Sequence, residues 1–137
     1  MTRALDLNLA RQALDAAMRG AIERRAAVGI SVVDGRGDLV AMLRMDGAPW
    51  YTVAVSRGKA AAAAAFGKPS GELAPRADMP AFRMLQHEDG LVAQQGAVPI
   101  RVAGRVVGAI GVSGATSELD EQIAIDGASA VQVQEAS

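Results

Sequence analysis

Residues 104–121 have the sequence Gly104-Arg-Val-Val-Gly-Ala-Ile-Gly-Val-Ser-Gly-Ala-Thr-Ser-Glu-Leu-Asp-Glu121. The pattern predicts a strand that leaves a tight turn, followed by a glycine-rich corner and a capped helix start. Its first part, residues 105–115, aligns without gaps with residues 38–48, matching at the apolar strand positions and at a closing Gly-Ala. We therefore expect two related strands, each ending in a corner that carries different side chains.

Arg44 and Asp46 occupy the first corner, at the positions that Gly111 and Ser113 hold in the second. Because they are two residues apart on a strand, both side chains face the same way and could form an ion pair or contact a polar ligand. Lys59, about two turns into the next predicted helix, could lean toward this corner. The three residues would suit the recognition of an organic acid or proton transfer, and an ion-paired strand end that holds the fold or an oligomer together is the structural alternative.

The second corner, with Gly111, Ser113 and Gly114, has two interpretations. Small residues, free N–H groups and the positive end of the following helix could bind a carboxylate or propionate of a ligand. Alternatively, the glycines only permit the turn and pack closely against a helix. Asp120 and Glu121 are typical helix-start residues, and we give Asp120 a role in ligand binding only if it faces this corner.

The remaining pattern predicts alternating helices and hairpins. A first helix follows an N-cap at Asn8, and a last helix follows the capping-box pattern that begins at Ser117 and runs toward Val133. Between them we expect strands over residues 29–33, 39–45, 96–102 and 106–112, a helix over residues 51–66 and short helical turns over residues 72–90. Paired hairpins predict an antiparallel sheet covered by helices, an α+β sandwich, and disfavour a Rossmann fold.

Composition limits the function classes. The 137 residues, half of them hydrophobic, suit one domain spanning residues 1–137. Lys and Arg number 14 against 15 Asp and Glu, and aromatic residues are 3%, so we expect neither a nucleic acid nor a membrane as partner. The lack of cysteine, of a leader-like apolar segment and of a membrane-length apolar run favours a cytoplasmic protein. Abundant Ala and Gly predict a shallow core and a homo-oligomer.

Two isolated motifs carry weaker signals. His87 is the single histidine, so one chain cannot form a multi-histidine metal site. It is a weak candidate for a haem ligand, as are Tyr51 and a methionine, and its acidic neighbours favour a solvated loop instead. The pattern Ser56-x-x-Lys59 could place lysine beside a serine nucleophile, but two residues match by chance often.

Five motifs in register resemble the GlcG/HbpS-like family, also called the haem-degrading domain family. They are Arg44-Met-Asp-Gly-Ala48, Lys59-Ala60, Gly96-x-x-Pro99-Ile100, Gly108-Ala-Ile-Gly-Val-Ser-Gly114 and Asp120-Glu121. The resemblance implies a profilin-like α/β/α sandwich with about five antiparallel strands, homo-oligomers, haem or corrinoid binding, and a link to catabolic pathways. The chain departs from the family in its first helix, which has no histidine, and in Gln95-Gly96 and Gly114-Ala115.

Three functions remain open. The resemblance implies a small cytoplasmic ligand-binding protein for haem or a related tetrapyrrole, with Arg44, Asp46, Gly111, Ser113, Gly114 and Asp120 as binding residues. The residues also allow a cofactor-independent deaminase, hydrolase or isomerase of a small organic acid, in which Arg44 binds the carboxylate and Asp46 or Lys59 moves the proton. The third is a structural or regulatory oligomer without a small ligand.

Overall fold

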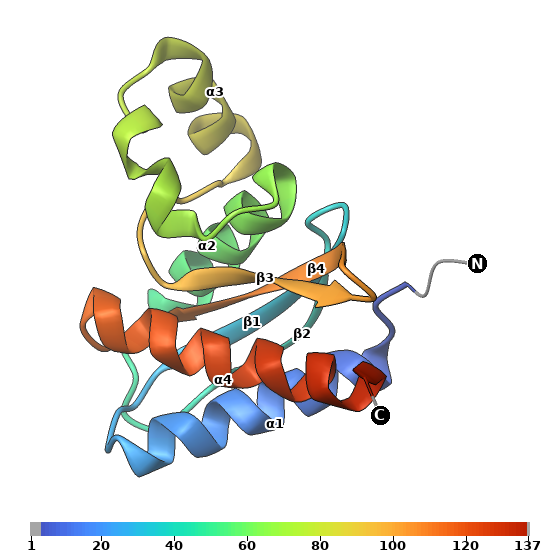
Figure 1. Ribbon diagram of the computed structural model, residues 1–137. Coiled ribbons are helices and arrows are strands. Elements are labelled where there is room, and N and C mark those ends of the chain that lie inside the picture. The colour runs from blue at the N-terminus through green and yellow to red at the C-terminus, as the bar shows by residue number, and fades with distance from the viewer. Residues whose placement is uncertain (1–3, 137) are drawn as a thin grey trace.

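The computed structural model describes residues 4–136, with side chains described to Val131. Figure 1 shows the helices and strands around a central sheet. In chain order they are α1 (Leu7–Glu23), β1 (Gly29–Asp34), β2 (Leu39–Arg44), α2 (Thr52–Phe66), the 3₁₀ helix η1 (Ser70–Arg76), α3 (Pro80–Asp89), β3 (Ala97–Val102), β4 (Arg105–Ser113) and α4 (Ser117–Ala136). The predicted order of helices and hairpins is confirmed.

The sheet has four strands in the order β2-β1-β4-β3, and all neighbouring strands are antiparallel. The expectation of about five strands was one too many for the part of the chain that the structure describes. The β3–β4 turn forms at Ala103 and Gly104, both with positive φ (52° and 78°), as the paired strands of a tight hairpin require. The two related strands, β2 and β4, flank β1, so that Arg44 and Ser113 both pair with Gly29 at one end of the sheet.

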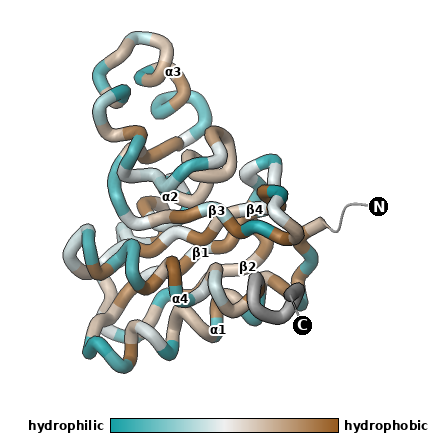
Figure 2. The backbone as a smooth tube through the Cα atoms, viewed as in Figure 1, coloured by the Kyte–Doolittle hydropathy of each residue, from teal (hydrophilic) through white to brown (hydrophobic). Residues whose placement is uncertain are grey.

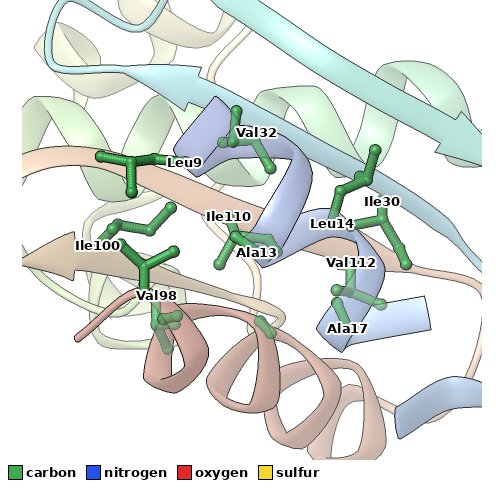
Figure 3. Close-up of a cluster of buried hydrophobic side chains, with 14 of the residues drawn as sticks. Leu9, Ala13, Leu14, Ala17, Ile30, Val32, Val98, Ile100, Ile110 and Val112 are labelled. Carbon is green, nitrogen blue, oxygen red and sulfur yellow. The ribbon is translucent and has the colours of Figure 1, made fainter. Parts of the chain in front are cut away.

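Helices α1 and α4 cover one face of the sheet, and α2 covers the other (Figure 1). The larger core lies on the first face, where Figure 3 shows side chains of α1 among those of the strands. Its members include Leu9, Ala13, Leu14, Ala17, Ile30, Val32, Val98, Ile100, Ile110 and Val112. The α2 face has a layer of smaller residues, namely Val33, Ala60, Ala63, Ala64, Ala97 and Ala109. The alanine-rich helix α2 therefore packs closely on the sheet.

A bulge in β4 changes the face of one residue. Strict alternation along β4 would place Val107 on the same face as Ala109, but Ile100 pairs with Gly108 and Arg101 with Val106, so Val107 has no partner on β3. An extra residue in one strand reverses the alternation of side chains on either side of it. Val107 accordingly packs in the larger core on the opposite face from Ala109.

Two helix caps differ from the prediction. Asp6, not Asn8, caps α1, because its Oδ1 accepts a hydrogen bond of 2.8 Å from the Leu9 backbone N–H. At α4 the capping side chain is Thr116, whose Oγ1 accepts from Leu119 N–H at 3.2 Å, so Ser117 lies inside the helix. Such side-chain acceptors supply the partners that the first turn of a helix otherwise lacks.

The segment that contains η1 and α3 packs on the outer side of α2 (Figure 1). Its contact centres on Phe82, buried at 4% exposure, whose ring stacks on Phe66 with centroids 5.4 Å apart. Ala62, Leu73, Leu91 and Ala93 complete this small cluster. Figure 2 shows hydrophobic residues concentrated in the central strands, whereas α3 has both hydrophobic and hydrophilic residues along its length. Among the helices that the structure describes, none combines the length and the apolar character needed to cross a membrane.

Candidate functional site

The glycine-rich corner after β4 encloses a buried ion pair. Lys59 Nζ lies 3.3 Å from Asp120 Oδ2 and donates a second hydrogen bond, of 3.0 Å, to the carbonyl oxygen of Val112. The two side chains are 5% and 4% exposed. Asp120 also accepts a hydrogen bond of 2.9 Å from Ala115 N–H, with the backbone of Gly114 on the same carboxylate. Asp120 therefore faces the corner, as a role for this residue in ligand binding requires.

Gly96 makes room for the lysine. It has a φ of 143°, and its carbonyl oxygen accepts from Val112 N–H at 2.9 Å. A Cβ at this position would lie 2.7 Å from both Lys59 Nζ and the Val112 carbonyl oxygen, and the positive φ also disfavours a side chain. The glycine thus opens the passage through which a side chain of α2 reaches a helix on the other face of the sheet. The sequence showed Gly96 only as part of a family motif, without this role.

Burial dominates the electrostatics of the pair. It lowers the pKa of Lys59 below its ordinary value of 10.5, against the charge and hydrogen bond of Asp120, which raise it. It raises the pKa of Asp120 above 3.8, against the backbone hydrogen bond from Ala115 and the charge of Lys59, which lower it. Both shifts have the sign that loss of solvent imposes on a charged group. Such opposed shifts also occur at sites of proton transfer.

Other parts of the protein occupy the space beside the predicted ligand-binding residues of this corner. A Cβ on Gly111 would collide with the Ser56 carbonyl oxygen and lie 2.8 Å from Ala60 N, so α2 packs directly on this glycine. Ser113 is buried at 6% exposure and pairs with Gly29. The backbone donors that we expected to bind a ligand carboxylate face Asp120 instead. This geometry favours the structural interpretation of the glycines.

The other corner is open to solvent. Arg44 and Asp46 are both exposed, and within the described residues they form no ion pair with each other. Arg44 Nη1 donates instead to the carbonyl oxygen of Ala48 at 2.9 Å, which closes the loop after β2. Lys59, expected to lean toward this corner, points to Val112 and Asp120. The three proposed catalytic residues therefore do not form one cluster.

The two isolated motifs are separate from these corners. His87 is exposed and lies in the last turn of α3, within the short helical turns predicted over residues 72–90 rather than in a loop. Ser56 and Lys59 are not hydrogen-bonded to each other: Ser56 Oγ shares a buried hydrogen bond of 2.8 Å with Ser31 Oγ and also donates to Val53 O at 3.2 Å, while Lys59 Nζ donates to Val112 O and Asp120. The Ser-x-x-Lys pattern is thus a coincidence of sequence in this fold.

A groove that the sequence did not predict runs along α2. It has a volume of about 590 Å³ and lies between α2, the β1–β2 turn and the end of α3. Ala54, Ala61 and Ala65 of α2 line it, and their spacings of seven and four residues place them on one side of the helix, which we call the floor of the groove. Its remaining lining residues are Arg36, Gly37, Asp38, Val53, Arg57, Gly58, Phe66, Leu85, Asp89, Gly90 and Leu91. Three distant segments meet here, so no contiguous motif marks the groove.

Close packing at Gly58 fixes one wall of this groove. The Gly58 carbonyl oxygen accepts from Val92 N–H at 3.0 Å, and a Cβ on Gly58 would collide with the Val92 side chain. The chain leaving α3 therefore crosses α2 in direct contact. Together with the stacked rings of Phe66 and Phe82, this crossing holds α3 at the side of the groove.

The groove combines apolar walls with charged groups at its rim. The guanidinium groups of Arg36 and Arg57 make no hydrogen bond or ion pair within the described chain, and both side chains are exposed. Asp38 and Asp89 line the same groove and are exposed as well. Unpaired guanidinium groups beside an apolar floor suit a ligand that has a hydrophobic body and carboxylates.

The family model for haem-degrading HbpS-like proteins matches residues 5–129, so the chain belongs to the HbpS-like family. A curated relative is the uncharacterized 15.0 kDa protein of the dhaT-dhaS intergenic region of Citrobacter freundii. It is 32% identical over 124 residues, which cover 88% of this chain and 87% of the relative. The family predicted from the five motifs is thereby confirmed.

Solved structures share the fold closely. Klebsiella pneumoniae ORFY has a TM-score of 0.85 at 28% identity, covering 96% of this chain and 92% of its own. A double mutant of Streptomyces reticuli HbpS has a TM-score of 0.83 at 33% identity, covering 94% and 88%. PduOC, solved in complex with haem, has a TM-score of 0.82 at 26% identity, covering 93% and 95%. The α+β sandwich with an antiparallel sheet is thus shared throughout this set.

Proposed function

We propose that this chain binds a planar tetrapyrrole of the haem class in the groove along α2. The observation that carries the proposal is the pairing of an apolar floor with two unpartnered guanidinium groups, Arg36 and Arg57. The family description and the haem complex of PduOC supply independent support for this ligand class.

The groove suits the shape and charge of such a ligand. Its volume of about 590 Å³ is within the usual range for small-molecule sites. The small floor residues would let a flat ring approach the helix, while Phe66 and Leu85 would cover its edges. The guanidinium groups would bind the propionates in two-point hydrogen bonds. When bound, haem would supply its iron centre, and the role of this chain would be to hold and orient the ring.

A haemin titration followed in the Soret region tests the proposal. We expect a saturable, stoichiometric shift that weakens in Arg36→Gln and Arg57→Gln by roughly fivefold in Kd each, about 1 kcal/mol for an exposed charge. Arg83→Gln is the matched control, because Arg83 is an exposed arginine that does not line the groove. Binding that does not saturate, or that the three variants change equally, would reject the groove as a tetrapyrrole site.

One observation favours a second candidate, a cofactor-independent enzyme for a small organic acid. Lys59 and Asp120 place an amine 3.3 Å from a carboxylate, and burial shifts their pKa values in opposite directions, as also occurs at sites of proton transfer. The test is exchange of the proton next to a carboxylate, followed by NMR in D₂O for a set of small organic acids. Exchange that is lost in Asp120→Asn while circular dichroism shows this variant to be folded, and that is kept in Arg57→Gln, supports this function. The absence of exchange with every acid counts against it.

The remaining predicted roles have direct tests. Native mass spectrometry of Arg44→Ala and Asp46→Ala measures whether either exposed side chain retains a small carboxylate. Light scattering at micromolar concentration measures the homo-oligomer expected from the alanine-rich composition, and a monomer mass would refute it.

A further inference from the structure

We infer that the groove recognises a tetrapyrrole by its ring face and its carboxylates and without coordinating the metal, so that a metal-free porphyrin dicarboxylate binds about as tightly as haemin. This inference rests on the proposed function. It specifies which features of the ligand the protein recognises, namely the ring face and the carboxylates.

The residues that line the groove lack the side chains that ordinarily ligate haem iron. Proteins hold haem iron with the side chains of His, Cys, Met or Tyr. Each residue that lines the groove is described by the structure, and the set contains none of these four types. Its polar side chains are two arginines, which offer only donors, and two aspartates. The groove thus has the means to bind propionates and an apolar ring, but lacks the ordinary means to ligate iron.

The single histidine, His87, lies on a different side of α3 from the residues that line the groove. Leu85 and Asp89 line the groove and, being four residues apart, share one side of α3. His87 lies midway between them and therefore about 200° around the helix from each, at about 100° per residue. Its imidazole consequently emerges on the side of α3 that faces away from the groove. The exposure of His87 agrees with this placement.

The other candidate ligands are also directed elsewhere. Tyr51 stands edge-on against the exposed ring of Trp50, with ring centroids 5.9 Å apart, and does not line the groove. Met84 is 60% exposed and precedes Leu85, so it leaves α3 about 100° away from the lining face. Neither residue has to be displaced for a ring to lie on α2.

The charges at the rim of the groove predict how each rim residue affects the affinity for a ligand that carries carboxylates. Arg36 and Asp38 come from the same turn, and Arg57 of α2 shares the groove with Asp89 of α3. A ligand carboxylate would be attracted by the arginines and repelled by the aspartates. The aspartates should therefore limit the affinity for any dicarboxylate, with or without iron. If a carboxylate ligated iron instead, its replacement would weaken haemin alone.

The experiment compares haemin, protoporphyrin IX and the dimethyl ester of protoporphyrin, each titrated under conditions in which the porphyrin is monomeric. Binding is followed by quenching of the fluorescence of Trp50, the single tryptophan. We expect haemin and protoporphyrin IX to bind within about threefold of each other in Kd, and the ester about tenfold more weakly, because it lacks the carboxylates. His87→Ala, Met84→Leu and Tyr51→Phe should leave both Kd values unchanged. The double variant Asp38→Asn/Asp89→Asn should lower both Kd values, because it removes the repulsion between the aspartates and the ligand carboxylates.

The outcomes separate this inference from the proposal beneath it. If haemin binds at least tenfold more tightly than protoporphyrin IX, or if His87→Ala, Met84→Leu, Tyr51→Phe or the double aspartate variant weakens haemin selectively, iron is ligated and the inference is wrong. If neither porphyrin saturates the protein, the proposed function itself fails. If both saturate equally but Arg36→Gln and Arg57→Gln have no effect, binding occurs outside the groove, and the inference fails with the groove.

Discussion

Lys59 and Asp120 are 61 residues apart in sequence, belong to helices on opposite faces of the sheet, and meet with Nζ 3.3 Å from Oδ2. The contact ties α2 to the first turn of α4 around the end of β4. Because both side chains are buried, each depends on the other to offset the loss of water around its charge.

Removal of either partner alone should therefore destabilise the protein strongly. We expect Lys59→Met and Asp120→Asn each to lower the free energy of unfolding by about 3–5 kcal/mol, and Lys59→Met/Asp120→Leu to cost less than the sum of the two. Urea denaturation measures all three. Arg24→Gln is the control, since the Arg24–Asp126 pair is 2.7 Å long but 27% and 30% exposed, and should cost about 1 kcal/mol or less. Additive effects at Lys59 and Asp120 would contradict the coupling.

The titration of Asp120 should respond to Lys59. The lysine charge and hydrogen bond lower the pKa of this carboxyl, so Lys59→Met should raise that pKa further above 3.8 than burial already does. A raised pKa means that the folded state keeps a proton that the unfolded state has lost. The stability contributed by Asp120 is thus complete below pH 3.8 and lost as the pH rises through the folded pKa. In Lys59→Met this loss should extend to higher pH.

Carboxyl ¹³C NMR follows the titration directly, and urea denaturation at several pH values follows the stability. Asp120→Asn in the Lys59→Met background removes the titrating group and should abolish the extra pH dependence. An Asp120 carboxyl that titrates at lower pH in Lys59→Met than in the unmodified chain would refute the assignment.

The packing of α2 on β4 makes Gly111 irreplaceable. We expect Gly111→Ala to lower the free energy of unfolding by about 3 kcal/mol, the upper end for overpacking, because the added carbon meets backbone atoms of Ser56 and Ala60. Thermal denaturation measures the loss. In Gly35→Ala, the matched control, the new carbon would lie 3.6 Å from its nearest neighbour, and the change should stay within about 0.5 kcal/mol. Equal effects of the two substitutions would show that Gly111 has room for a side chain or ligand.

Phe82 should control the stability of α3 separately from that of the sheet. Its ring is buried against Phe66, so Phe82→Ala should cost this segment about 3–5 kcal/mol. Because η1 and α3 lie outside the two sheet-facing cores, we expect faster amide hydrogen exchange over residues 70–91 while β1 and β4 keep their protection. Phe82→Leu should restore much of the protection. A uniform loss across all strands would show that the segment unfolds only with the whole domain.

The hairpins and most helix limits follow from local sequence. The turn at Ala103-Gly104 and the stop at Gly67, which adopts a left-handed conformation with φ of 64°, are both decided by residues a few positions apart. The bulge at Val107 was not predictable, because it depends on the pairing of Ile100 with Gly108 across the sheet. The cap at Asp6 was missed because Asp6 and Asn8 are equally good caps by residue type.

The candidate sites depend on contacts that are distant in sequence. Lys59 was recognised as important, but nothing in its neighbourhood indicates that Gly96 opens a path to Asp120. The groove was missed entirely, because its floor looks in the sequence like an ordinary alanine-rich helix. Its rim residues Arg36 and Asp89 come from a turn and from the end of another helix, and only the fold places them beside Arg57.

The thin alanine layer under α2 has an evolutionary consequence. On the α1 and α4 face, one large core side chain can become smaller when a neighbouring one becomes larger, so compensating substitutions are available. Between α2 and the sheet, the partners are mostly alanine, glycine and backbone, with Val33 the largest side chain of the cluster, so few neighbours can shrink to accept a larger side chain. Substitutions at this interface should therefore be rare. New ligand preferences should arise by substitutions in the β1–β2 turn and in α3, which can vary without disturbing the interface.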